Sequence, residues 1–259
     1  MFSREGAART EQQNRLVAGC LAAVGGFVNS SGFVLVGTFT SHVTGNVGRL
    51  ANDLAQNQYA AAIGALGMIV AFFAGAFAAS MIVESHFWGG HVSRAYAYAL
   101  AVEAALLIAF TLISDPGTHA HPRVRDAEAL LLCSAMGMQN SLVTRLSGAV
   151  VRTTHLTGVV TDLGIEAARW FRFWRLRVSK ATRVRLIFGR NSPERPSLAK
   201  FRLLSTIVAA FLAGASLGAL SAISLHHWAM IIAALAVAVC SAYAALTRPL
   251  ERSDATPPR

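Results

Sequence analysis

Long stretches without charged residues are the feature that most limits how this chain can fold. Residues 60–83, 95–113 and 203–225 contain a single charged side chain between them, that of Glu103. Each stretch is close to the roughly 20 residues that an α-helix needs to cross the core of a bilayer. Only 14% of all residues are charged, whereas soluble domains usually have about a quarter. The sequence therefore predicts a membrane protein.

The alternation of apolar stretches with polar segments predicts six transmembrane helices. Backbone groups in lipid must hydrogen-bond within the chain, so we expect an all-α fold. The expected helices are residues 16–39, 60–83, 92–113, 127–147, 201–224 and 227–246. Cys20, Cys133 and Cys240 lie in these stretches without the spacing of metal ligands, so no disulfide, metal site or cofactor is expected.

The basic residues predict an orientation. Of the 23 Lys and Arg, 18 fall in the N-terminal segment, the second and fourth loops and the tail. The loops on the other side would carry Arg49, Arg123 and Arg125. The positive-inside rule then places both termini in the cytoplasm.

Residues 169–202 form a strongly basic segment. It holds 11 of the basic residues against one acid, Glu194, and four aromatic residues are interleaved near its start: Trp170, Phe171, Phe173 and Trp174. Basic residues beside a membrane helix attract anionic lipid by about 1 kcal/mol each, and aromatic rings favour the headgroup region. We therefore expect an interfacial loop that contacts anionic lipid, in preference to a nucleic-acid-binding arm.

A polar motif of the form [ST]-H-x-T-G occurs twice, at residues 41–45 and 154–158. Upstream of each copy lies Gly-x-x-Asn, at residues 26–29 and 137–140, followed at equal distance by a glycine. The second copy has two extra residues between that glycine and its histidine. The order of these features suggests that the two halves of the chain are related.

A second, independent similarity supports the duplication. Residues 71–76 and 210–215 differ at one place in six, and both continue with small residues at four-residue spacing. The two stripes are Ala71, Gly75, Ala79 and Ala210, Gly214, Gly218. Such stripes let membrane helices approach closely, either within one chain or between the chains of a homo-oligomer.

Two repeats of three helices would be inverted relative to each other, because an odd number of crossings reverses the second copy. We therefore predict a 3+3 inverted repeat whose helices break at the [ST]-H-x-T-G motifs. The predicted division is a cytoplasmic segment 1–15, a first repeat 16–125, a second repeat 126–248 with the basic loop 169–202, and a cytoplasmic tail 249–259.

Several of these segments resemble the YoaK-like family of bacterial membrane proteins. The similar segments are residues 32–33, 41–46, 137–140, 145–148, 151–158 and 161–164, and the similarity extends from about residue 16 to 246. The resemblance implies a multi-pass inner-membrane protein of uncharacterised role. Members of that family often have Asp where this chain has Asn29, so the resemblance implies no charge-based role for Asn29.

Polar residues at membrane depth are costly, which makes them candidates for function. Broken helices expose N–H and C=O groups that transporters use to hold ions and small substrates. The candidate substrate-binding residues are Asn29, Ser41, His42, Thr44, Asn46, Asn140, Arg145, Arg152, Thr154, His155, Thr157 and Asp162. The alternative is that the imidazoles and hydroxyls only satisfy the broken backbone and cap the next short helix.

The charged residues at depth also allow two interpretations. Arg145 and Arg152 can bind an anionic substrate through two parallel hydrogen bonds, or they can form ion pairs with Asp162 or Glu103. Structural pairing is favoured because an unpaired charge in the membrane is so unfavourable. Glu103 stands alone in its predicted helix and is a candidate for a proton relay.

The sequence is compatible with three classes of function. The first is a small secondary transporter or permease for an unknown solute or ion, with its site at the two histidine motifs. The second is a non-transporting membrane module that binds anionic lipid or a partner through the basic loop. An intramembrane enzyme is less favoured, because Ser41 and His42 are adjacent and two histidines fall short of the three ligands of a catalytic zinc.

Overall fold

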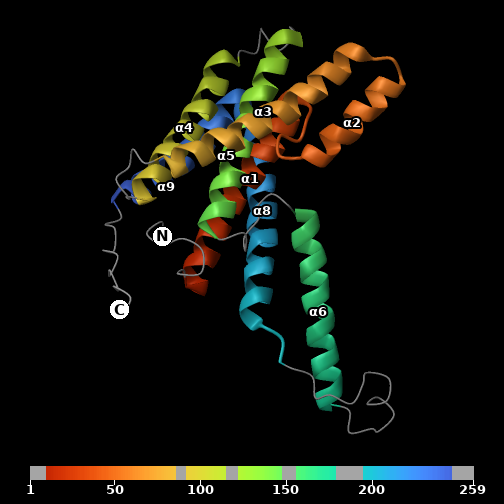
Figure 1. Ribbon diagram of the computed structural model, residues 1–259, viewed down its shortest axis with the longest axis vertical. Helices are drawn as coiled ribbons and strands as arrows, with labels where there is room; N and C mark the ends of the chain where they lie inside the picture. Colours follow the sequence, from red (N-terminus) through yellow and green to blue (C-terminus); the bar gives the residue numbers. More distant parts are fainter. Residues whose placement is uncertain (1–9, 86–91, 115–121, 148–155, 179–194, 247–259) are drawn as a thin grey trace, which may run out of the picture.

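The computed structural model describes residues 10–85, 92–114, 122–147, 156–178 and 195–246 (Figure 1). Within these residues all regular structure is helical, which confirms the all-α prediction. The helices are α1 (Glu11–Val36), α2 (Val43–Ala55), α3 (Tyr59–Glu84), α4 (Val92–Ile113), α5 (Pro122–Leu146), α6 (Leu156–Val178), α8 (Leu198–Leu225), the 3₁₀ turn η3 (His226–Trp228) and α9 (Ala229–Leu246).

The ends of α1 follow from local sequence. Thr10 and Gln13 form a capping box, in which the Thr10 hydroxyl accepts from the Gln13 N–H and the Gln13 side chain accepts from the Thr10 N–H. The helix ends where Gly37 adopts φ 77° and donates its N–H to the Phe33 carbonyl. A residue without Cβ enters this left-handed conformation easily, so the predicted helix 16–39 ends three residues early.

A short helix, α2, follows this break and folds back onto α3. It starts directly after His42 and ends before Asn57, which has φ 59° in the tight connection to α3. Asparagine tolerates this left-handed conformation better than most residues. Figure 1 shows α2 and the first part of α3 as a pair that projects from the rest of the molecule.

Gly75, the glycine in the small-residue stripe of α3, lies where α3 crosses α5 very closely. A Cβ added to Gly75 would collide with the carbonyl oxygen of Ser134, and one added to Gly137 would collide with the carbonyl oxygen of Phe72. Helices approach this closely in membranes when small residues line the contact. The crossing therefore depends on glycine from each partner.

The crossing of α1 with α8 repeats this arrangement at corresponding sequence positions. A Cβ on Gly214 would meet the Ala23 carbonyl, and a Cβ on Gly26 would meet the Phe211 carbonyl. Gly214 and Phe211 correspond to Gly75 and Phe72 in the aligned hexamers. Both small-residue stripes thus pack within a single chain.

Four continuous helical stretches in the described part of the chain are long and apolar enough to span a membrane. They are α1, α3, α4 and the stretch Leu198–Leu246, which contains α8, η3 and α9. The chain changes direction within that last stretch at His226, where φ is 54° (Figure 1). The predicted helix 127–147 forms as part of α5 but is less apolar, since it carries Glu128, Gln139 and Asn140.

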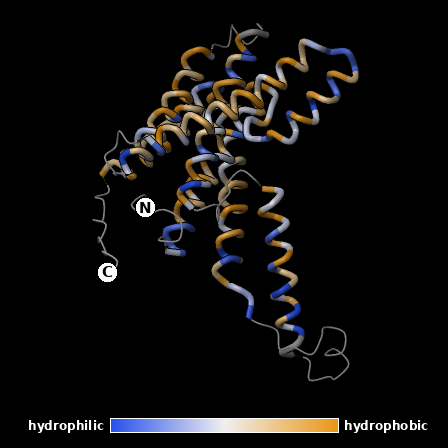
Figure 2. Tube along the Cα trace, viewed as in Figure 1, coloured by the Kyte–Doolittle hydropathy of each residue, from blue (hydrophilic) through white to orange (hydrophobic). Residues whose placement is uncertain are grey.

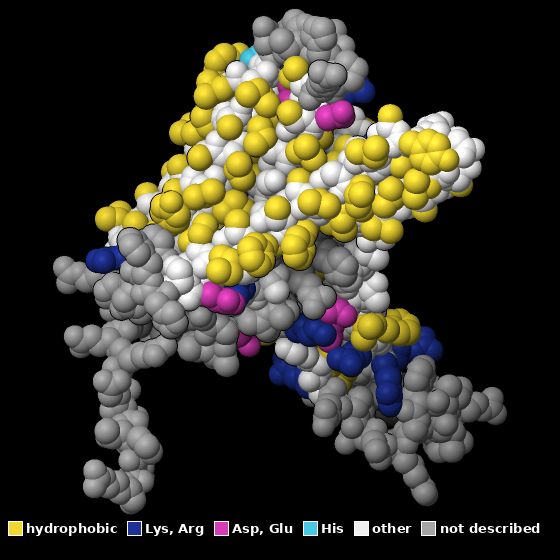
Figure 3. Space-filling view, turned by 45° about the horizontal axis from the view of Figure 1, so that its top comes forward, with side chains coloured by type: hydrophobic (Ala, Val, Ile, Leu, Met, Phe, Trp, Pro, Cys, Tyr) yellow, Lys and Arg dark blue, Asp and Glu magenta, His cyan; other side chains and the backbone are white. Residues whose placement is uncertain are grey.

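The outer surface of the helical body is apolar. Figure 3 shows hydrophobic side chains over most of the described upper surface, and exposed examples include Phe73 on α3 and Leu212 on α8. Hydrophilic segments gather at the lower ends of α1, α6 and α8 and at the connection of α2 with α3 (Figure 2). An apolar belt with a polar end is the surface of a membrane-embedded protein.

The glycine crossings predict a selective loss of stability. Gly75→Ala or Gly214→Ala is expected to destabilise the protein by about 1–3 kcal/mol, because the added methyl group meets backbone and not a movable side chain. Thermal unfolding in detergent measures this loss. The control is Gly64→Ala in the same helix as Gly75, where a Cβ meets nothing within 4 Å. Equal melting temperatures for the Gly64 and Gly75 variants would contradict this account of the packing.

Candidate functional site: a cavity at the histidine motif

A cavity of about 780 Å³ lies where both [ST]-H-x-T-G motifs meet the helix crossings. Its described lining comes from α1, the loop after it, α2, α3, α5, α6 and α8. We call it the motif cavity. The lining residues are Asn29, Phe39, Ser41, His42, Val43, Thr44, Phe72, Asn140, Thr144, Leu156, Thr157 and Phe211.

The Asn29 side chain holds the loop between α1 and α2. Its Oδ1 accepts a hydrogen bond from the Ser41 N–H at 3.0 Å and another from the Ser41 hydroxyl at 2.9 Å. These bonds satisfy polar groups that the interrupted helix leaves without partners. Because Asn29 also lines the cavity, the residue that fixes the loop is part of the cavity wall.

His42 precedes the first turn of α2 and makes no side-chain cap to it. Its imidazole lies directly over Gly45, where an added Cβ would collide with the ring carbon Cδ2. This contact explains the spacing of histidine and glycine in the motif. The ring is exposed and lines the cavity, so it is available to a ligand.

Eight of the twelve described lining residues form matched pairs between the two halves of the sequence. Thr44 and Thr157 occupy the same place in the two motifs and both reach the cavity at the starts of α2 and α6. The other matched positions in the lining are Val43 with Leu156, Asn29 with Asn140 and Phe72 with Phe211. Segments more than 100 residues apart therefore supply equivalent side chains to one space.

The structure brings together six of the predicted site residues. These are Asn29, Ser41, His42, Thr44, Asn140 and Thr157. Arg152, Thr154 and His155 lie outside the described residues. Asn46 is buried in the first turn of α2 and is not in the described lining, and neither is Asp162, which lies further along α6.

Arg145 has a different partner from either that the sequence suggested. Its guanidinium Nη1 lies 2.6 Å from Oε1 of Glu84, at the end of α3, and not against Asp162 or Glu103. The close packing of α3 on α5 brings these two helix ends together. Arg145 is thus paired with an acid, as expected. The expected partners, Asp162 and Glu103, were wrong for Arg145, because the sequence does not show which helices pack beside each other.

Glu103 lies apart from the motif cavity. Its side chain on α4 is completely buried, and neither carboxylate oxygen has a hydrogen-bond partner among the described residues. None of the described cavity lining comes from α4. A proton relay between Glu103 and the cavity therefore has no direct contact to support it.

The sequence patterns did not predict the aromatic part of the site. Phe72 and Phe211 were used as evidence of the repeat, but not as site residues, although both line the cavity. Their matched places in the two hexamers were the signal that could have identified them. Phe39 stacks on Phe33 with ring centroids 4.3 Å apart, and Thr144 completes the polar lining one helical turn after Asn140.

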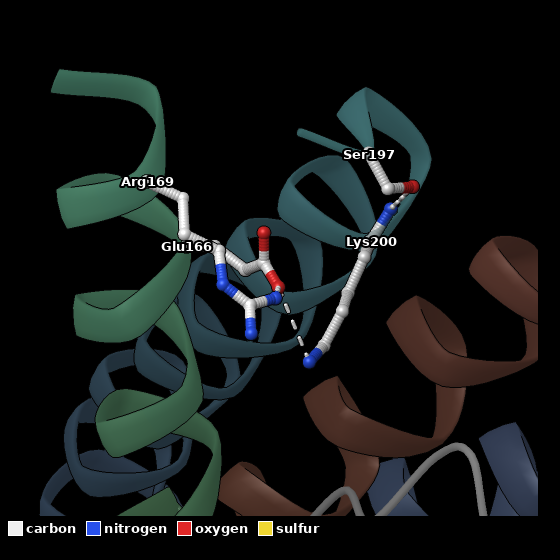
Figure 4. Close-up of polar contacts among 4 residues, drawn as sticks. All are labelled: Glu166, Arg169, Ser197 and Lys200. Carbon is white, nitrogen blue, oxygen red and sulfur yellow. Dashed lines mark hydrogen bonds and ion pairs between the residues drawn. The ribbon is translucent and has the colours of Figure 1, made fainter. Parts of the chain in front are cut away.

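A buried acid, Glu166, was also missed. Its Oε1 accepts a hydrogen bond from Arg169 at 2.9 Å and lies 3.3 Å from the Lys200 ammonium, so it joins α6 to α8 (Figure 4). The i,i+3 spacing of Glu166 and Arg169 is visible in the sequence, whereas Lys200 approaches only through the fold. No group of three metal-ligating side chains occurs within the described ranges.

Comparison with known proteins identifies the family. The family described as "Protein of unknown function (DUF1275)" matches residues 17–243. The chain belongs to the DUF1275 family. A relative in Bacillus subtilis (strain 168), "UPF0700 transmembrane protein YoaK", is 27% identical over 148 residues, which confirms the resemblance seen in the motifs.

This member of the DUF1275 family is accordingly a membrane protein, because it has helices long and apolar enough to span a membrane and its relative is a transmembrane protein. The match to YoaK covers 56% of this chain, and the chain spans about three fifths, 62%, of the relative's length. No solved structure matches this member of the DUF1275 family.

The Asn29–Ser41 bonds predict how the loop responds to substitution. Asn29→Ala removes the acceptor of two hydrogen bonds and is expected to lower stability by about 1–3 kcal/mol and to speed amide exchange in residues 37–42. Asn29→Asp keeps the acceptor and is expected to retain slow exchange. Asn52→Ala, on the exposed surface of α2, is the control. Identical exchange for the Ala and Asp variants would contradict the proposed role of the side chain.

The ion pairs of Glu166 predict a local change in α6. Glu166→Gln weakens the contact with Lys200, so amide exchange in α6 is expected to rise while exchange in α4 and α9 stays unchanged. Hydrogen–deuterium exchange with mass spectrometry measures both. Asp162→Asn is the matched control, because this acid of α6 has no partner among the described residues. An equal effect of the two variants would show that Glu166 does not hold α6.

Proposed function

We propose that this protein is a transporter or permease for a small solute or ion and that the motif cavity is its substrate site. The observation that carries the proposal is the matched lining, in which Asn29 and Asn140, Thr44 and Thr157 belong to different halves of the chain. Transporters commonly place their substrate between two related repeats. A cavity shared by both motifs fits that arrangement.

The proposal includes the six-helix, 3+3 inverted repeat. In this arrangement α1, α3 and α4 form the first repeat, α5, α8 and α9 form the second, and α2 and α6 are the segments that follow each break. The equivalent glycine crossings of α3 with α5 and α1 with α8 support it, since each pairs a helix of one repeat with a helix of the other. The charge distribution supports an inner-membrane protein with both termini in the cytoplasm.

The lining indicates how a substrate would be held. Amide and hydroxyl groups of Asn29, Thr44 and Thr157 can replace the hydration shell of a polar solute, and the starts of α2 and α6 add backbone N–H groups. Phe72 from the first repeat and Phe211 from the second provide apolar contact to the substrate. Movement of one repeat against the other would then expose this site to each side of the membrane in turn.

We propose transport and not catalysis for this cavity. The Ser41 hydroxyl donates to Asn29, so it is not activated by the neighbouring imidazole of His42. The second proposal from the sequence, a non-transporting module that contacts anionic lipid or a partner, is favoured by the exposed arginines on α6. The two proposals differ in whether the motif cavity must open to both sides of the membrane.

Cysteine accessibility tests the transport proposal without a known substrate. In a background with Cys20, Cys133 and Cys240 changed to Ser, Thr44→Cys and Thr157→Cys are expected to react with a membrane-impermeant methanethiosulfonate added to either side of oriented proteoliposomes. Cysteine placed at Gly64, on the surface of α3, is the control for side-independent background labelling. Reaction of both cavity cysteines from one side only would contradict alternating access and favour the module.

A functional assay completes this test. His42→Ala is expected to abolish uptake of a solute that the wild-type protein accumulates in proteoliposomes, with thermal stability unchanged, because the ring is exposed and makes no cap. A defined panel of radiolabelled amino acids, sugars and monovalent ions serves as the probe. Full uptake by the His42→Ala variant would remove the imidazole from the proposed substrate site.

A further inference from the structure

A second cavity, of about 570 Å³, lies between the first turns of α1 and α8. We call it the foot cavity, because its lining residues belong to the hydrophilic lower ends of α1 and α8 that Figure 2 shows. Three cationic side chains line it, those of Arg15, Lys200 and Arg202, against one carboxylate, that of Glu11. The motif cavity shares none of these residues.

Two of the three cations have no partner among the residues that the structure describes. The guanidinium groups of Arg15 and Arg202 make no ion pair or hydrogen bond to any part of the chain that the structure describes, and both residues are exposed. Lys200 is held by Glu166, but Arg169 already pairs with the same carboxylate. Among the described residues, the guanidinium groups of Arg15 and Arg202 are therefore not ion-paired.

Exposed apolar and aromatic side chains occur on α1 and α6, both of which pack on α8. Leu16 follows Arg15 and is 58% exposed, and on α6, which packs on α8, Phe171 and Trp174 are 59% and 61% exposed. Figure 3 shows dark blue Lys and Arg side chains grouped at this end of the molecule beside hydrophobic ones. Cations next to exposed aromatic rings are typical of the headgroup region of a membrane.

We propose that the foot cavity binds the headgroup of an anionic phospholipid. A guanidinium binds phosphate oxygens through two parallel hydrogen bonds, and Arg15 and Arg202 present two such groups from different helices. Ser197, which caps the start of α8 by accepting from the Lys200 N–H at 3.2 Å, places that helix start in the same wall. The acyl chains would lie along exposed apolar residues such as Leu16.

The adjoining apolar surface favours lipid over other phosphate ligands. Soluble phosphate needs no neighbouring apolar side chains, whereas a phospholipid buries its chains beside its headgroup. A nucleic acid requires a basic stripe that follows its backbone, and the foot cavity is a compact site between two helix starts. This site is independent of the transport proposal, because it would bind lipid whether or not the motif cavity carries a solute.

Lipid binding to the purified full-length protein tests the proposal. Native mass spectrometry from detergent, with added phosphatidylglycerol or phosphatidylcholine, measures the apparent affinity for each. Wild-type protein is expected to prefer phosphatidylglycerol. Each of Arg15→Gln and Arg202→Gln is expected to weaken phosphatidylglycerol binding about fivefold, and the double variant about 25-fold, with phosphatidylcholine binding unchanged.

Two controls separate the foot cavity from general surface charge and from unfolding. Arg94→Gln removes an exposed arginine of α4 that is outside the cavity and is expected to leave lipid binding unchanged. Melting temperatures measured in phosphatidylcholine nanodiscs show whether the variants are folded. Wild-type affinity in the folded double variant would overturn the proposal, and so would an equal loss in the Arg94 variant.

A third arm distinguishes lipid from free phosphate. Inorganic phosphate at millimolar concentration is expected not to displace phosphatidylglycerol, because it gains no apolar contact at the cavity. Displacement by inorganic phosphate would overturn the lipid assignment and identify a site for the free ion. Displacement by a short single-stranded oligonucleotide would likewise overturn it in favour of a nucleic-acid contact.

Discussion

Backbone contact between helices at glycine determines how the rest of this molecule is arranged. At the crossing of α3 with α5 and at that of α1 with α8, there is no room for even one methyl group between the backbones. In lipid there is little hydrophobic force between helices, so close van der Waals packing must hold them together. These crossings bring Phe72 and Phe211 into the cavity that described residues of both histidine motifs also line.

The motif cavity is a consequence of that packing together with the interrupted helices. A helix that ends at Gly37 leaves backbone groups exposed, and Asn29 satisfies some of them through Ser41. The remaining polar groups border a space that neither half of the chain encloses alone. Structure and candidate function are linked here, because the side chain that stabilises the break also forms the wall of the cavity.

The two cavities differ in what stabilises their surroundings. The motif cavity is surrounded by packed helices, whereas near the foot cavity Glu166 of α6 pairs with Lys200 of α8. Ion pairs with exposed partners contribute less than buried packing, since water competes for the charges. The helix α6 is therefore held less strongly than α1 and α8, whose first turns line the foot cavity.

Hydropathy and composition were enough to predict a membrane-embedded, all-helical chain, and the resemblance of its motifs indicated the family to which it belongs. The repeated motifs also indicated which polar residues to examine, and Thr44 and Thr157 indeed reach one cavity. These properties are local or periodic along the chain, so they are readable without coordinates.

The tertiary structure alone decided which residues meet. The pairing of Arg145 with Glu84, the isolation of Glu103 from the cavity and the approach of Lys200 to Glu166 all depend on which helix packs beside which. Apolar stretches of similar composition do not encode their neighbours in a form that periodicity reveals. Neighbours are selected by the fit of small residues such as Gly75 and Gly214 against a partner backbone, and that fit exists only in three dimensions.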